Sequence, residues 1–354
     1  MTKKTSIRIN KIEINAYKGI DHLELSFPTG KMMDDPDVNI LGSMNGIGKT
    51  STLECCALLL LAASSSKEVF WEESEFFAEA VKSGEQKASI IGDIAVGRTV
   101  HHVEIKFDAR GRIEVNGLIG ALSGRVGRQG RSIIRGIQGL YSDPVDGKGF
   151  FFLHSYRKVQ EGRPELGSLL GEEPAIMDLA SRPLSRRYWD SERVSFSMFK
   201  SLIVRHLMES ANLFETPLRP DRKANDDTLA IATLNNLLET YARVKVGKLR
   251  PFRNNTIDVQ VEHLDAPGKG FSIDGLSSGQ KEIIASLFLI WNKTHKSPFV
   301  VLIDEPELHL NVQWHSGFVG KLLEIAPQNQ YIMATHAEAI MDSVRSENRH
   351  LLMD

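Results

Sequence analysis

A glycine-rich turn between two apolar segments restricts the fold of this chain more than any other feature of its 354 residues. The short apolar segment Val38–Leu41 predicts a buried strand. The turn after it reads Gly42-Ser-Met-Asn-Gly-Ile-Gly-Lys-Thr50, and apolar residues from about Lys49 to Ala63 predict a helix. A strand, a glycine-rich turn and a helix in this order indicate the first unit of a phosphate-binding α/β fold.

This turn resembles the Walker A motif, Gly-x4-Gly-Lys-Ser/Thr, although Ser43 stands where the pattern has its first glycine. Triphosphate is strongly anionic, and backbone N–H groups at the start of a helix bind such groups with help from the helix dipole. Lys49 is expected to contact the β- and γ-phosphates, and Thr50 to coordinate Mg²⁺. The residues predicted to contact the nucleotide here are Asn45, Gly46, Gly48, Lys49, Thr50 and Ser51.

A second apolar strand ends in two acids, Phe299-Val-Val-Leu-Ile-Asp-Glu-Pro306, and resembles the Walker B motif. Ligands of open α/β sheets bind at the carboxyl ends of the strands, which is where these acids are predicted to lie. Successive side chains of a strand point to opposite faces, so the two acids have different roles. Asp304 is predicted to bind Mg²⁺, and Glu305 to orient and polarise the attacking water.

The segment Leu276-Ser-Ser-Gly-Gln-Lys281 resembles the ABC signature, Leu-Ser-Gly-Gly-Gln, with Ser278 in place of the first glycine. It opens a predicted helix, so its hydroxyls and free N–H groups form a second phosphate-binding surface. The resemblance implies that this surface binds the γ-phosphate of the nucleotide on the opposite protomer, and hence a head-to-head dimer or a larger oligomer. The residues assigned to it are Ser277, Ser278, Gly279 and Gln280.

A third apolar strand, Tyr331-Ile-Met-Ala-Thr-His336, ends in a residue that resembles the switch histidine of the ABC family. The resemblance implies that His336 touches the γ-phosphate or the attacking water. Ala337-Glu338 follows in place of the more usual Ser-Pro.

Two further segments narrow the branch of the family. Asn15-Ala-Tyr-Lys-Gly-Ile20 is similar to the opening of RecF, SMC and OLD-type ATPases, which implies that Lys18 lies near the nucleotide. Asp304-Glu-Pro-Glu-Leu-His-Leu310 resembles a segment of stand-alone and OLD-like ATPases, in which we expect His309 to pack near the protomer interface. The long distance from Lys49 to the signature argues against a transporter subunit, and we expect no Toprim nuclease.

Apolar periodicity predicts the remaining architecture. Residues 7–27 and 88–115 alternate between apolar and polar side chains, as antiparallel strands do, whereas the last third of the chain alternates helices and strands, as a parallel core does. We therefore predict an α/β fold, an ABC-type P-loop ATPase head with an antiparallel β subdomain and a helical insertion with helices at Ser195–Leu213 and Thr228–Val246. The expected parts are an N-terminal ATPase lobe at 1–159, the helical insertion at 160–248 and a C-terminal ATPase lobe at 249–354.

Composition limits the environment and the partners. The formal net charge of -2 gives no global basic field for nucleic acid, although a local basic face stays open. The most apolar run, Cys55–Ala63, is shorter than the roughly 20 residues of a membrane span, and the first ten residues do not resemble a signal peptide. We expect a cytoplasmic protein without a membrane partner, and the adjacent Cys55 and Cys56 as buried, reduced thiols.

The resemblance implies an ATPase that uses ATP and Mg²⁺ and acts as a nucleotide-gated dimeric switch. Relatives of this shape commonly control a separately encoded effector, such as a nuclease, in bacterial antiphage systems of the Septu, retron or PARIS kind. A RecF-like DNA-binding repair ATPase stays an alternative, and so does a nucleotide-bound structural scaffold, although Glu305 and His336 argue against the scaffold. The arginines considered for DNA phosphates are Arg125, Arg128, Arg131, Arg135, Arg182, Arg186 and Arg187.

Overall fold

The computed structural model describes two compact units of the chain. Unit 1 consists of residues 1–157 and 293–354, and unit 2 consists of residues 158–292. The predicted site residues Asn45 and Gly46, and all seven arginines considered for DNA, lie outside the described residues. The described residues are 7–28, 36–42, 48–63, 75–117, 145–147, 149–155, 157, 159, 162–164, 198–211, 224–266 and 268–352.

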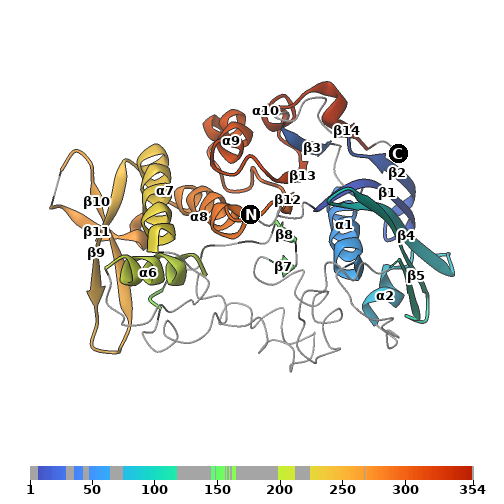
Figure 1. Cartoon of the computed structure of the whole chain (residues 1–354), viewed down its shortest axis with the longest axis horizontal. Coiled ribbons are helices and arrows are strands. Elements are labelled where there is room, and N and C mark those ends of the chain that lie inside the picture. Colours follow the sequence, from blue (N-terminus) through green and yellow to red (C-terminus); the bar gives the residue numbers. More distant parts are fainter. Residues whose placement is uncertain are drawn as a thin grey trace. The chain divides into compact units, whose positions relative to one another are not determined.

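Unit 1 contains a five-stranded antiparallel sheet with the strand order β2-β1-β4-β5-β6 (Figure 1). The predicted hairpin is confirmed, because β1 and β2 pair with Ile12 opposite Leu25. A tight turn joins β5 and β6, with Gly111 N donating to Asp108 O at 2.8 Å. The strands are β1 Ile7–Tyr17, β2 Ile20–Ser26, β4 Lys87–Val96, β5 Thr99–Asp108 and β6 Ile113–Asn116.

A second, six-stranded sheet of unit 1 has the order β14-β3-β13-β12-β8-β7, and its strands are parallel except for β7. This confirms the predicted parallel core. Parallel register aligns the carboxyl ends of β3, β12 and β13, since Asp304 pairs with Ala334 and Thr335 with Gly42. The strands are β3 Asp37–Gly42, β7 Val145–Gly147, β8 Phe150–Leu153, β12 Val300–Asp304, β13 Gln330–Thr335 and β14 Arg349–Leu351.

Helix α1 (Lys49–Ala63) lies in the core of unit 1, where it contacts strands of both sheets. Its side chains are buried around almost the whole circumference, which explains why its sequence shows no polar face. Cys55 and Cys56 are buried free thiols on this helix, as predicted. The other helices of unit 1 are α2 Glu75–Ala80, α9 Val312–Ile325, α10 Glu338–Met341 and the 3-10 turn η4 Ser346–Asn348.

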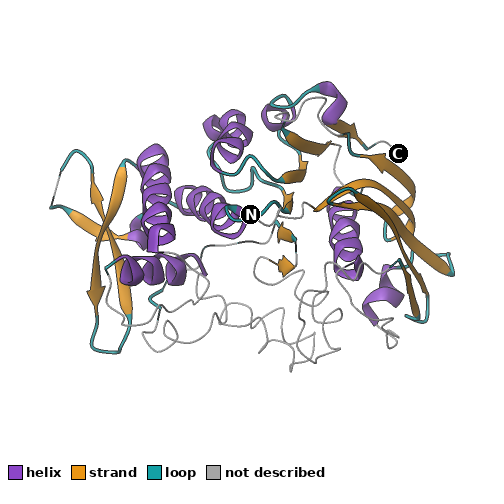
Figure 2. Ribbon diagram, in the orientation of Figure 1, coloured by secondary structure: helices purple, strands orange, loops and turns teal. Residues whose placement is uncertain are grey.

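Unit 2 combines helices with a three-stranded antiparallel sheet of order β11-β10-β9 (Figure 2). Leu234, Leu237 and Leu238 of α7 are fully buried and lie at helical spacing on one face. His206 of α6 contacts both other helices. Its Nδ1 lies 2.7 Å from Asp227 Oδ1 of α7, and its Nε2 lies 3.1 Å from Asn292 Oδ1 of α8. The elements are α6 Met198–Ser210, α7 Ala224–Ala242, β9 Val244–Pro251, β10 Ile257–His263, β11 Gly270–Ser272, the 3-10 turn η3 Ile273–Gly275 and α8 Ser278–Thr294.

The helix predicted at Thr228–Val246 was wrong at both ends, since α7 begins at Ala224 and ends at Ala242. Arg243 has a left-handed backbone with φ of 52°, which stops the helix. The β-branched Val246 lies in β9 and pairs with Val261 of β10. Strand β9 crosses the expected domain boundary at 248/249. Tertiary pairing therefore overrode a local helical pattern here.

None of the helices in the described part of the chain is both long and apolar enough to cross a membrane.

Candidate functional site

The predicted Walker residues of unit 1 meet at the aligned carboxyl ends of β3, β12 and β13. Gly48 begins the turn into α1 with φ of 85°, a conformation that favours glycine. A Cβ at this position would lie 2.7 Å from Ile20 Cγ1, so the close approach of β2 also requires glycine. Thr52 secures the first turn, because its N and its Oγ1 both donate to Gly48 O, at 2.8 and 2.9 Å. Both the backbone and the neighbouring Ile20 therefore require glycine at the start of α1.

Lys49 is buried at this edge of the sheet, and its Nζ lies 3.4 Å from His336 Nδ1. Burial lowers the pKa of Lys49, while the carboxylates of Glu305, Asp304 and Glu307 oppose that shift. A desolvated ammonium gains most from an anionic partner, which suits a phosphate contact. The structure therefore brings the predicted Walker A lysine next to the predicted switch histidine, although 287 residues separate them.

Thr50 and Asp304 form a pair of hard oxygen donors. The Thr50 hydroxyl donates to Asp304 Oδ1 and Oδ2 at 3.1 and 3.0 Å. Burial, and then the neighbouring Glu305 carboxylate, raise the pKa of Asp304 to about 6, while the hydroxyl of Thr50 opposes the shift. A divalent cation would remove this penalty, and Mg²⁺ typically takes one or two carboxylates together with substrate phosphates. The donor set fits Mg²⁺, which would be held by Thr50 and Asp304 and would neutralise phosphate charge.

Glu305 has a left-handed backbone with φ of 46°, which is uncommon for a residue with a side chain. Such a conformation costs about 1–3 kcal/mol and is concentrated at functional sites. Glu305 lies just after β12, which ends at Asp304, and the different roles expected of the two acids stay a prediction. Sequence reasoning did not foresee the strained backbone, because nothing in the apolar strand pattern specifies it.

Glu307 was not singled out by sequence reasoning, yet it holds the end of β13. Its Oε2 accepts from the Thr335 hydroxyl at 2.7 Å, and its Oε1 accepts from the backbone N of His336 at 2.7 Å. Thr335 Oγ1 in turn accepts from Ala337 N at 3.0 Å. The carboxylate thus fixes the backbone that carries the exposed His336, and the acid-rich segment after Asp304 was the signal that could have found it.

The ammonium group of Lys18 pairs with a carboxylate of α1. Its Nζ donates to Glu54 Oε2 at 2.6 Å, and the Tyr17 hydroxyl donates to the same oxygen at 3.0 Å. The Glu54 side chain is 2% exposed, whereas that of Lys18 is 34% exposed. Lys18 therefore compensates a buried carboxylate of α1, and its predicted contact with nucleotide stays a prediction.

The signature residues open α8 in unit 2. Ser277 N donates to Gln280 Oε1 at 3.0 Å and Gln280 N donates to Ser277 Oγ at 3.3 Å, which is a reciprocal capping box. Gln280 Nε2 also donates to Tyr241 O at 3.1 Å. Ser277 and Ser278 are exposed, and Gly279 and Gln280 are half-buried. Both serines are therefore exposed at the start of α8.

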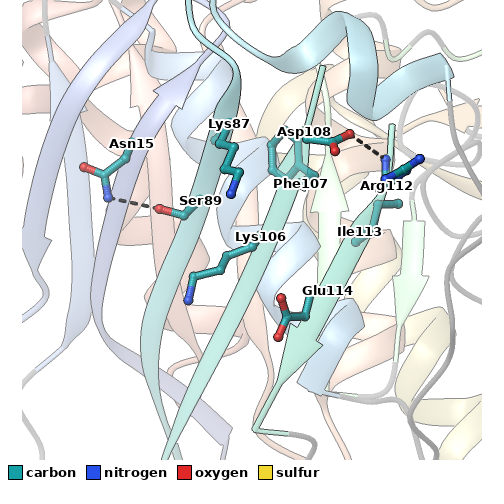
Figure 3. A pocket seen from close by; sticks show the side chains of 10 residues that line it. Asn15, Lys87, Ser89, Lys106, Phe107, Asp108, Arg112, Ile113 and Glu114 are labelled. Atoms are coloured by element: carbon teal, nitrogen blue, oxygen red, sulfur yellow. Dashed lines mark hydrogen bonds between the residues drawn. The ribbon is translucent and has the colours of Figure 1, made fainter. Parts of the chain in front are cut away.

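A pocket of about 390 Å³ lies on the five-stranded sheet of unit 1 (Figure 3). None of the predicted nucleotide-binding residues lines it. Its cations Lys87, Lys106 and Arg112 face the acids Asp108 and Glu114, so the mixed charge gives no clear preference for an anion. This pocket is not the candidate nucleotide site.

Comparison with protein families gives a match over residues 175–342 to the model described as "AAA domain, putative AbiEii toxin, Type IV TA system". The matched range includes the signature, Asp304, Glu305 and His336, whereas the first residues of α1 precede it.

One curated relative is the "Retron Vc95 probable ATPase" of Vibrio cholerae serotype O1 biovar El Tor, which is 35% identical over 99 residues. The match spans 24% of this chain and only 19% of the length of that relative.

Two solved structures of Smc heads share the fold across nearly the whole chain. One is the SmcHead bound to the C-winged helix domain of ScpA, with a TM-score of 0.52 and 14% identity over 95% of this chain and 91% of the other. The second is the Smc head domain with an extended coiled coil, bound to the C-terminal domain of ScpA derived from Pyrococcus furiosus. Its TM-score is 0.50 at 13% identity, over 96% of this chain and 92% of the other. The predicted fold class is confirmed.

Proposed function

We propose that this chain, an ABC-type ATPase with the head fold of the SMC proteins, is a nucleotide-gated dimeric switch that hydrolyses ATP. Two protomers would each supply the Walker residues to one nucleotide and the signature to the other. The observation that supports the proposal is that Lys49 lies beside His336 and Thr50 beside Asp304 within unit 1, while Ser277 and Ser278 are exposed on unit 2.

The chemistry follows from the side chains at this site. Lys49 would bind the β- and γ-phosphates, and the Glu305 carboxylate would accept the proton of the attacking water. A bond forms between the water oxygen and the γ-phosphorus, and the bond from that phosphorus to the β–γ bridging oxygen breaks, which releases ADP. His336 would donate a hydrogen bond to the γ-phosphate, held in place by Glu307.

The dimer would act as a switch because a nucleotide held by one protomer gains contacts with the signature of the other protomer only in the closed pair, and so binds that pair more tightly. Closure would be favoured while ATP is intact, and hydrolysis would release the protomers. This mechanism makes the lifetime of the dimer depend on Glu305.

The test is the variant Glu305→Gln, which cannot accept the proton. With Mg-ATP it should accumulate as a dimer in multi-angle light scattering, whereas Lys49→Ala, which cannot bind the phosphates, should remain monomeric. A Glu305→Gln protein that stays monomeric in saturating Mg-ATP, or that hydrolyses ATP at the wild-type rate, would refute the switch.

The biological role that we infer is control of a separate effector in antiphage defence, supported by the similarity to a retron ATPase. The prediction is that a locus with Lys49→Ala loses protection in a phage plaque assay, while Arg110→Gln, an exposed residue of the β5–β6 turn, retains it. If both variants protect equally well, nucleotide binding by Lys49 is not required for defence, and the proposed role is refuted.

Nucleic-acid binding is a second candidate function, favoured by a basic strip along β9. Five exposed cations of unit 2 belong to it, and none forms an ion pair with another described residue. Phe252 organises the strip, because the guanidinium carbons of Arg163 and Arg250 lie 3.6 and 5.4 Å from its ring centroid. The cations are Arg163, Lys245, Lys248, Arg250 and Arg253.

A nucleic acid bound here would be held mainly through phosphate contacts. Replacing the four cations of 245–253 with alanine should weaken binding to single- and double-stranded DNA in fluorescence polarisation. It should also reduce the salt dependence by about one unit of slope per lost contact. Lys11→Ala, whose lysine pairs with Glu24 on the five-stranded sheet, is the control. Unchanged affinity in the alanine variant would exclude this candidate.

A further inference from the structure

Arg157 connects the end of β8 to the backbone of the two Walker B acids. Its Nη1 donates to Asp304 O at 2.6 Å and to His154 O at 3.1 Å, and its Nη2 donates to Glu305 O at 2.7 Å. The guanidinium therefore spans two successive carbonyl groups of the turn that follows β12. Arg157 is also the last residue of unit 1 before the chain enters unit 2.

The geometry of this contact is specific to arginine. A guanidinium presents its N–H donors in a rigid planar fork, so two neighbouring carbonyls can be bound at once in a fixed orientation. A lysine ammonium is a point donor on a flexible stem and does not impose that orientation. Arg157 is thus suited to fix the direction of the 304–305 peptide groups.

Glu305 needs such support, because its left-handed backbone persists only where neighbouring contacts determine it. On one side, Glu305 N donates to Ala334 O of β13 at 2.8 Å. On the other, Glu305 O accepts from Leu308 N at 3.0 Å and from Arg157. Arg157 is the charged donor among these contacts, and it approaches from β8, on the opposite side of β12 from β13.

We propose that Arg157 is a positioning residue for the ATPase reaction, which holds Glu305 in its left-handed conformation and so directs the carboxylate at the attacking water. This inference rests on the proposed role of Glu305. Loss of the fork would let residue 305 relax toward a right-handed or extended backbone and would displace its carboxylate. The hydrogen bonds described for Arg157 end on the backbone carbonyls of His154, Asp304 and Glu305, so its loss should affect nucleotide binding itself little.

The experiment compares Arg157→Lys and Arg157→Gln with wild type in the full-length chain. Turnover of Mg-ATP should fall about 10- to 100-fold in both variants, as expected for a misplaced reacting group, while equilibrium affinity for ATP changes by about twofold or less. A crystal structure of Arg157→Gln without nucleotide should show that φ of residue 305 has left the left-handed region. Arg110→Gln, an exposed arginine of unit 1, should match wild type in every measurement.

The outcomes distinguish failure of the positioning role from failure of the proposed function. Wild-type turnover in both Arg157 variants, or an unchanged backbone at residue 305, overturns the positioning role. A loss of ATP affinity in the same proportion as turnover also overturns it, because that pattern indicates general damage. Should Arg157→Gln not fold, the charge-retaining Arg157→Lys carries the same test. If Glu305→Gln turns over normally, the proposed function fails, whatever the Arg157 variants do.

Discussion

Asp304 is a buried carboxylate, and its replacement by asparagine should stabilise the protein when nucleotide and metal are absent. Asp304 is 1% exposed, and burial together with Glu305 raises its pKa from 3.8 to about 6. At about 1.4 kcal/mol per pKa unit, the difference corresponds to ~3 kcal/mol of lost stability above pH 6. Asparagine removes the charge and can still accept the hydrogen bond from Thr50.

The sign of the pH dependence follows from the raised pKa. The folded protein retains the Asp304 proton to higher pH than the unfolded chain, so wild-type stability falls as pH rises from about 4 to about 6. The gain in Asp304→Asn should therefore be full at pH 7.5 and about half as large at pH 5. Structural relaxation reduces the expected gain at pH 7.5 to about 2 kcal/mol, which corresponds to a Tm increase of about 4–8 °C for a unit of this size.

The assay is calorimetric unfolding with EDTA and without nucleotide, at pH 7.5 and pH 5. Asp21→Asn is the control, because Asp21 is 80% exposed and its surface ion pair with Lys82 contributes little. Addition of Mg-ATP should then stabilise wild type but not Asp304→Asn. A lower Tm of Asp304→Asn at pH 7.5, or an equal gain at both pH values, would refute the reasoning.

Two further substitutions test the glycine turn before α1 and the end of β13, which precedes His336. Gly48→Ala should weaken ATP binding at least about tenfold in calorimetric titration and destabilise the protein by about 1 kcal/mol or more, because its Cβ would meet Ile20 at 2.7 Å in a left-handed backbone. Gly84→Ala shares the positive φ but has open space around it, so it should bind ATP normally; equal affinity in both variants would contradict the proposal. Glu307→Ala removes both acceptors that hold the backbone of His336, so turnover should fall about tenfold at nearly constant ATP affinity. Wild-type turnover in Glu307→Ala would show that the backbone of His336 needs no such support.

The sequence predicted the fold and several elements well where local chemistry and tertiary packing agree. The helix Lys49–Ala63 has the predicted bounds, since the glycine-rich turn precedes it and its apolar residues are buried in the core of unit 1. The helix ending predicted at Val246 failed because strand pairing with β10 competes with helical periodicity. Such pairing joins residues that are separated in the sequence, so a local pattern of side chains does not predict it.

For this protein, the sequence by itself determined which chemical groups are present and in what order: a lysine after a glycine-rich turn, two acids after an apolar strand, a Ser-Ser-Gly-Gln segment at a helix start and a histidine at a strand end. These follow from residue types and from periodicities of two and 3.6 residues, which are local properties. Only the tertiary structure decided how they are held, because the fork of Arg157 and the contacts of Glu305 and Glu307 with β13 join segments that follow neighbouring strands of the sheet. Parallel pairing aligned these strand ends, and that alignment requires the whole sheet.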